Sequence, residues 1–212
     1  MARRSLSELA FFSLLVYSPR GETEISKSSR QVRDQIKNAD PATLATAVTR
    51  LRSLLDKGDL SEFLGPEKVL IPAPRSAPVH GGGLWPAERI CATLVDAGLG
   101  REVLPCLERA TAVPKASFAV PGERPTVEQH MQSMRVRAQL VKAESLTIVD
   151  DFVTKGRMLF ASAGLVQAAY PTAQVRAFAL IRTLGMVPEI ERILEPCTGR
   201  IFARDDDVVR EP

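Results

Sequence analysis

Residues Thr147–Met158 read TIVDDFVTKGRM, and this stretch decides how the rest of the chain is interpreted. Its apolar start predicts a buried strand that ends at two adjacent carboxylates, Asp150 and Asp151. The following Thr and Gly predict a short loop, and the Ala-rich segment Arg157–Tyr170 predicts a helix. Loop amides and a helix N-terminus favour anions, and Gly156 allows a ligand to approach the backbone closely. A sugar phosphate fits this combination, with hydroxyls on the aspartates and phosphate on the amides.

The segments on both sides of this motif alternate between strand-like and helix-like patterns. Strands are predicted at Val69–Ile71, Val103–Leu107, Leu146–Val149 and Val175–Ile181, and helices at Pro86–Asp96, Val127–Lys142 and Arg157–Tyr170. This alternation predicts an α/β fold, with a twisted, mostly parallel sheet of about five strands flanked by helices.

The segments before and after this core are predicted to be additions to it. Residues 1–65 form an α-rich N-terminal addition with one strand-like run, Ser13–Tyr17, a helix over Ser26–Asn38 and a second helix that Asp40 caps. The core is expected over 66–185 and a C-terminal extension over 186–212. The charged end of this extension, Arg204–Pro212, is expected to fray.

The composition narrows the classes of protein and partner. Of the 212 residues, 45% are hydrophobic and 25% are charged, which excludes a disordered or collagen-like chain. The net charge of +3 suits an anionic ligand, whereas only 5% aromatic residues offer few stacking platforms, so nucleic-acid binding is not indicated. Three widely spaced cysteines predict reduced thiols in a cytoplasmic protein. No apolar run approaches the roughly 18 residues of a membrane span, so no membrane partner is expected.

The TIVDDFVTKGRM motif resembles the phosphoribosyl pyrophosphate binding motif of type I phosphoribosyltransferases. In that family a few apolar residues precede two acids, two mostly apolar residues and a Thr-x-Gly loop. The resemblance implies that Asp150 and Asp151 bind the 2′ and 3′ hydroxyls of ribose at the catalytic centre. It also implies that the 5′-phosphate is bound by the segment Val153, Thr154, Lys155, Gly156, Arg157 and Met158.

A second stretch extends the resemblance. Residues Val69–Ser76, VLIPAPRS, look like the family's first sheet strand and the loop that contacts pyrophosphate, with Arg75 and Ser76 as donors. The order of VLIPAPRS, a Gly-containing loop, a helix, LERAT, a long polar loop and VDD is most like the competence-protein (ComF-like) branch. The segment Arg109–Arg135, which overlaps the Pro-rich, polar stretch Glu108–Thr126, would then be a flexible loop that closes over the substrate.

On this resemblance, the expected function is binding of phosphoribosyl pyrophosphate together with Mg²⁺. Transfer of the phosphoribosyl group to a nitrogen acceptor would follow, with release of pyrophosphate. Magnesium would arrive with the ligand and need few protein ligands. Relatives of this kind are commonly homodimers.

Departures from the family pattern leave a second function open. Met158 stands where the family has Thr or Ser, and a thioether cannot donate a hydrogen bond to phosphate, although Lys155 and Arg157 could supply charge instead. The alternative is a non-catalytic protein that binds phosphoribosyl pyrophosphate or a nucleotide in regulation, DNA uptake or defence. The sequence has no GxxxxGK[ST] motif, which argues against a nucleoside triphosphatase. In a purely structural interpretation, the aspartate pair caps a turn and Arg75 and Ser76 lie in an exposed turn.

Overall fold

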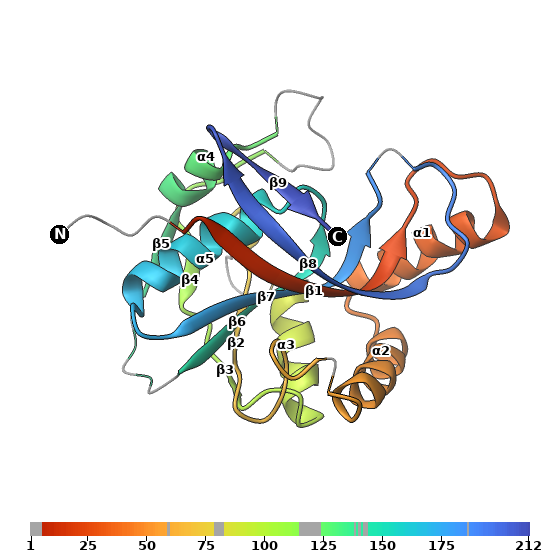
Figure 1. The fold of residues 1–212 in the computed structure, drawn as a ribbon, viewed down its shortest axis with the longest axis horizontal. Helices are drawn as coiled ribbons and strands as arrows, with labels where there is room; N and C mark the ends of the chain where they lie inside the picture. The colour runs from red at the N-terminus through yellow and green to blue at the C-terminus, as the bar shows by residue number, and fades with distance from the viewer. Residues whose placement is uncertain are drawn as a thin grey trace.

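The computed structural model describes residues 6–58, 60–78, 83–114, 124–137, 139, 141, 144–185 and 187–212. A seven-stranded sheet forms its centre, in the order β3-β2-β6-β7-β1-β8-β9 (Figure 1). Its strands are β1 (Glu8–Tyr17), β2 (Val69–Pro72), β3 (Glu102–Val103), β6 (Ser145–Val153), β7 (Gln174–Thr183), β8 (Leu194–Arg204) and β9 (Asp207–Glu211). A separate two-stranded ribbon joins β4 (Leu107–Arg109) to β5 (Met134–Val136).

Five neighbouring strands of the sheet, β3-β2-β6-β7-β1, run parallel, and β8 and β9 add an antiparallel hairpin beside β1. The prediction of an α/β fold with a mostly parallel sheet is therefore confirmed, with seven strands in place of about five. Strand β1 lies inside the sheet and pairs with both β7 and β8. The first 65 residues thus supply a central strand as well as helices.

Helices cover both faces of the sheet, as Figure 1 shows. The helices are α1 (Glu24–Lys37), α2 (Pro41–Leu55), α3 (Pro86–Asp96), α4 (Val127–Gln132) and α5 (Arg157–Ala169). Helix α5 packs on one face, where Leu159 and Val166 meet Ile148 in a buried cluster. Helices α1, α2 and α3 pack on the other face through Ile36, Leu51 and Ile90, which share a second buried cluster with Val149 and Phe178.

Two helix starts follow directly from local sequence. The side chain of Asp40 accepts a hydrogen bond from the Thr43 amide, and Pro41 takes the first helical position, as predicted for α2. Thr126 and Gln129 form a reciprocal capping box at α4. Helix α4 nevertheless ends at Gln132 and not at Lys142, because Met134–Val136 pairs with Leu107–Arg109 as the β4–β5 ribbon. This pairing also means that the predicted strand Val103–Leu107 is divided between β3 and β4.

Two other predictions about element ends were wrong. Strand β6 does not stop at Asp150 but continues to Val153, because β7 is long enough to pair Val153 with Arg182. The tail from Arg204 does not fray, because β9 pairs with β8 along its whole length and carries the buried side chain of Val208. The predicted flexible loop falls partly on 115–123, outside the described residues, and its described ends are the arms of the β4–β5 ribbon.

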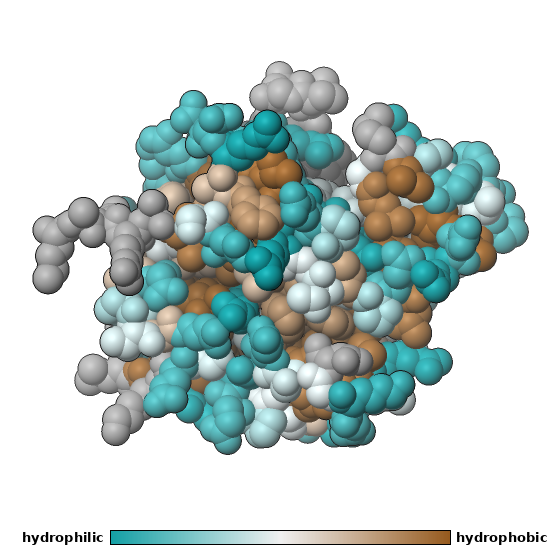
Figure 2. All heavy atoms as spheres, in the orientation of Figure 1, coloured by the Kyte–Doolittle hydropathy of each residue, from teal (hydrophilic) through white to brown (hydrophobic). Residues whose placement is uncertain are grey.

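Exposed apolar surface is divided into small areas. On the face shown in Figure 2, hydrophobic residues form separate patches among hydrophilic ones. Within the described ranges, the large exposed hydrophobic side chains are Ile25, Leu84, Val187 and Leu194. Among the same residues, no helix is both long enough and apolar enough to span a membrane.

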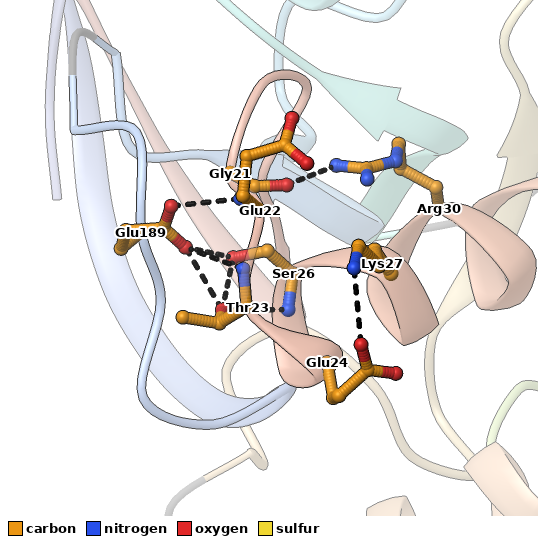
Figure 3. Close-up of polar contacts among 8 residues, drawn as sticks. All are labelled: Gly21, Glu22, Thr23, Glu24, Ser26, Lys27, Arg30 and Glu189. Carbon is orange, nitrogen blue, oxygen red and sulfur yellow. Dashed lines mark hydrogen bonds and ion pairs between the residues drawn. The ribbon is translucent and has the colours of Figure 1, made fainter.

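The loop between β7 and β8 caps the start of α1 (Figure 3). The Glu189 carboxylate accepts hydrogen bonds from the amides of Glu22 and Thr23, at 2.7 and 3.2 Å, and from the hydroxyls of Thr23 and Ser26, at 2.8 and 2.9 Å. These donors, the Glu22 amide first among them, lower the pKa of Glu189 to about 2. A side chain more than 160 positions away in the chain therefore fixes this end of the helix.

We expect Glu189→Gln to lower the melting temperature at neutral pH, because the amide cannot accept all of these bonds and carries no charge for the helix terminus. The folded-state pKa lies below the ordinary value of 4.5, so the stabilisation is present above pH 4.5 and is lost as the pH falls toward 2. The difference between the wild type and the variant should shrink over the same window in thermal unfolding. Glu191→Gln, in the same loop, is the control, and equal melting temperatures for wild type and Glu189→Gln at neutral pH would contradict the capping role.

Candidate functional site

The two predicted site segments meet at the carboxyl edge of the sheet, on neighbouring strands. Strands β2 and β6 pair in parallel from Val69–Leu146 to Pro72–Val149. From β2 the chain crosses to β3 through α3 on one face, and from β6 it crosses to β7 through α5 on the opposite face. Connections that diverge from adjacent strands leave a crevice between them, and this is the usual ligand position in open α/β sheets.

Three carbonyl groups of the loop after β2 accept hydrogen bonds from other parts of the protein. The Ala73 carbonyl accepts from the Trp85 indole at 2.8 Å, the Arg75 carbonyl from the Arg109 guanidinium at 2.9 Å, and the Ser76 carbonyl from the Val113 amide at 2.8 Å. Among the described residues, the backbone N–H groups of Arg75 and Ser76 have no acceptor. A loop with satisfied carbonyls and unpaired amides is a binding surface for anions.

The loop after β6 has the same character. Gly156 adopts a left-handed conformation (φ 88°) and leads into α5, whose first amides point out of the helix end. A Cβ at Gly156 would come within 2.5 Å of the Ile201 side chain on β8, so both its conformation and its surroundings require glycine. In the described part of the chain, the hydroxyl of Thr154 and the amide of Lys155 have no hydrogen-bond partner. These donors are free to bind an anion.

Asp150 and Asp151 lie on β6, directly after its last pair with β2 and just before the loop that leads into α5. Burial and the negative charge of Asp151 raise the pKa of Asp150 well above 3.8, and Lys37 on α1 opposes this rise. The Asp150 carboxylate also accepts the Asp151 amide at 2.9 Å. Two crowded carboxylates, one of them desolvated, are stabilised by hydroxyl donors or by a cation.

Lys155 and Arg157 point to a carboxylate on the C-terminal hairpin. Arg157 donates to both oxygens of Asp207 at 2.7 Å, and Lys155 binds the same carboxylate at 2.5 Å. Arg157 and Lys155 together hold the pKa of Asp207 well below its usual range. The two cations predicted to assist phosphate binding are therefore already paired with a carboxylate.

The Met158 sulfur lies 3.3 Å from a terminal nitrogen of Arg109. Val153 is buried in the cluster under α5 and supports the loop through packing. Arg109 and Asp207 were not predicted as site residues. Arg109 had only the LERAT stretch as a signal, and Asp207 lies in a tail that was expected to fray.

The donor set limits how a metal ion could bind. Within the ranges that the structure describes, no group of three or more His, Cys, Asp or Glu side chains could hold a metal ion. Asp150 and Asp151 could hold a hard cation such as Mg²⁺ only if oxygen atoms of a bound substrate or of water completed the coordination of the cation. Two hollows lined by described side chains lie elsewhere, one beside Arg176 and Arg200 and one beside Glu88.

Comparison of the chain with protein-family models gives no matching family, and comparison with curated proteins gives no match. Function is therefore inferred below from the geometry of this edge and from the motif.

We expect Asp150→Asn to raise the melting temperature at neutral pH. Because the folded-state pKa of Asp150 is raised, its ionisation opposes folding, and wild-type stability falls as the pH rises from 3.8 through the raised value. The gain in the variant should therefore disappear in acid, where Asp150 is protonated. Thermal unfolding as a function of pH measures this, with Asp34→Asn on the exposed side of α1 as the control. A lower melting temperature for Asp150→Asn at neutral pH would contradict it.

We expect Asp207→Asn to bind inorganic phosphate more tightly than wild type at low ionic strength, because it releases Lys155 and Arg157. The gain should fade with added salt, since partly exposed charges are screened over about 8–10 Å at ordinary ionic strength. Calorimetric titration at two salt concentrations measures both effects, with the exposed neighbour Asp206→Asn as the control. The same affinity and the same salt dependence for wild type and Asp207→Asn would show that Asp207 does not compete with the anion.

Proposed function

We propose that this protein binds phosphoribosyl pyrophosphate with Mg²⁺ and transfers the phosphoribosyl group to a nitrogen acceptor. One observation supports the proposal: two carboxylates near the end of β6 are followed by a loop with an unpaired amide, and the neighbouring strand β2 leads into a loop with two more, at the point where the connections of the two strands diverge. The ligand has the matching order of groups, a diol between a phosphate and a pyrophosphate. The resemblance of TIVDDFVTKGRM and VLIPAPRS to the phosphoribosyltransferase motifs supports the same assignment.

Each part of the ligand has a partner of suitable chemistry. The amides of Lys155–Arg157 and the Thr154 hydroxyl suit the 5′-phosphate, because they are donors at or just before a helix N-terminus. The carboxylates of Asp150 and Asp151 suit the ribose hydroxyls, which would donate to them. The amides of Arg75 and Ser76 suit the pyrophosphate. A magnesium ion carried by the ligand would offset the crowded negative charge of the aspartate pair.

The reaction requires positioning more than covalent chemistry from the protein. The acceptor nitrogen forms a bond to C1 of the ribose while the bond from C1 to the pyrophosphate oxygen breaks. Pyrophosphate leaves with the electron pair, and the acceptor nitrogen then loses its proton. Positive charge develops on the ribose ring, so the adjacent carboxylates of Asp150 and Asp151 stabilise it, while the loop amides hold the leaving group in place.

A non-catalytic binding role is the alternative, and two contacts favour it. The Met158 sulfur stands where a hydroxyl would bind phosphate, and Asp207 neutralises the two cations of the loop. Both features weaken the hold on the 5′-phosphate and leave ligand recognition possible. Release of pyrophosphate in the presence of nitrogen nucleophiles distinguishes the enzyme from the binding protein.

We expect wild-type protein to bind phosphoribosyl pyrophosphate in the presence of Mg²⁺, and Asp151→Asn to bind it roughly tenfold or more weakly. A hydrogen bond to a charged group contributes about 1.5–3 kcal/mol, and the amide also loses the charge that attracts the cation. Isothermal titration measures both affinities.

The matched control is Asp96→Asn, at the end of α3 that enters β3, on the opposite edge of the sheet. Its affinity should equal that of wild type. The proposal fails if folded wild-type protein does not bind phosphoribosyl pyrophosphate with Mg²⁺, or if Asp151→Asn binds it as tightly as wild type.

A further inference from the structure

Arg109 is a buried cation behind the crevice. It lies on β4 and is only 5% exposed. Its Nε donates to the Arg75 carbonyl at 2.9 Å, one terminal nitrogen donates to the Ser133 hydroxyl at 2.5 Å, and the other lies 3.3 Å from the Met158 sulfur. Among the described residues, no carboxylate forms an ion pair with it, unlike Arg157 with Asp207.

A buried guanidinium without a carboxylate is unfavourable for folding. Carbonyl and hydroxyl oxygens satisfy some of its donors, but a thioether is a weak acceptor and none of these groups is charged. Burial accordingly lowers the pKa of Arg109 to about 10. A net positive charge is thus kept in the interior, and an anion that arrives nearby would stabilise it.

The contacts of Arg109 link the two anion-binding loops. Its bond to Arg75 fixes the loop after β2, and its contact with Met158 reaches the first turn of α5. A single side chain from a third segment therefore sets the distance between the loop suited to pyrophosphate and the loop suited to the 5′-phosphate.

His130 lies beside this cation and reports on the local charge. Its side chain is 7% exposed, and its Nδ1 has no hydrogen-bond partner in the described part of the chain. Burial, Arg109 on β4 and Arg157 on α5 lower the pKa of His130 to about 4. The imidazole of His130 is therefore neutral at neutral pH. Of the two arginines near it, Arg157 is paired with Asp207, whereas Arg109 has no carboxylate partner among the described residues.

We propose that Arg109 is a positioning residue for the phosphorylated ligand: it sets the spacing of the two loops, and its uncompensated charge is balanced by the ligand's anionic groups. This inference rests on the proposed function and assigns a role within the same site to a residue of a third segment. It gives a role to a cation that is buried without a carboxylate partner among the described residues.

The first test compares wild type with Arg109→Gln, which removes the charge and keeps hydrogen-bond donors. In the absence of ligand, the variant should melt at the same temperature as wild type or higher. Its affinity for phosphoribosyl pyrophosphate and for inorganic pyrophosphate should fall roughly tenfold or more. A purely structural arginine gives the opposite pattern, a lower melting temperature with unchanged affinity, and that result would overturn the inference.

The second test uses the wild-type protein and does not depend on the folding of a variant. The chain has two histidines, so His130 can be followed by NMR titration, with His80→Gln to assign its signal. The pKa of His130 should rise when inorganic pyrophosphate or phosphoribosyl pyrophosphate saturates the protein, because the anion offsets the charge of Arg109.

An unchanged His130 titration at saturation would overturn the inference while leaving the proposed function standing. Failure of the proposed function has a different signature, since wild-type protein would then bind neither phosphoribosyl pyrophosphate nor pyrophosphate in the calorimeter.

Discussion

Strands β2 and β6 are adjacent and parallel, but their connections leave on opposite faces of the sheet, and the site depends on this divergence. The Ala73 amide makes the last bond from the β2 segment to β6, to the Val149 carbonyl, and the chain then leaves the ladder. In the loop after β2, the indole of Trp85 donates a hydrogen bond to the Ala73 carbonyl and the guanidinium of Arg109 donates one to the Arg75 carbonyl. The amides of Arg75 and Ser76 have no acceptor among the described residues, so the backbone alone favours an anion at this crevice.

Charges that are unfavourable for folding gather around this crevice. Asp150 is desolvated beside a second carboxylate, and Arg109 is buried without one. The two groups lie on different elements, β6 and β4, and no ion pair joins them. Opposed, poorly compensated charges at one edge are typical of a binding site, because a ligand with both hydroxyl and anionic groups satisfies both.

Local sequence patterns were sufficient for much of this architecture. The apolar run before Asp150, the proline at the start of α3 and the caps of α2 are local signals, and the structure has the elements that they predict. The aspartate pair, Thr154 and Gly156 share one short motif. Their meeting with Arg75 and Ser76 could be expected only from the parallel order of the strands.

The contacts that could not be predicted join segments far apart in the chain. Asp207 binds Lys155 and Arg157 across about 50 positions, and its tail appeared too charged to be ordered. The helix predicted to Lys142 ends early because Met134–Val136 has strand partners at Leu107–Arg109, and helical periodicity contains no information about such partners. The site role of Arg109 could not be predicted for the same reason, because its surroundings are formed by the end of α4, the start of α5 and the loop after β2 together.

Hydrogen exchange of backbone amides with separate parts of the ligand tests the central claim most directly. Inorganic pyrophosphate should protect the loop at 73–77, ribose 5-phosphate should protect 154–158, and phosphoribosyl pyrophosphate with Mg²⁺ should protect both at once. Protection of neither loop by the complete ligand, or protection confined to another edge of the sheet, would contradict the assignment of this crevice as the phosphoribosyl pyrophosphate site.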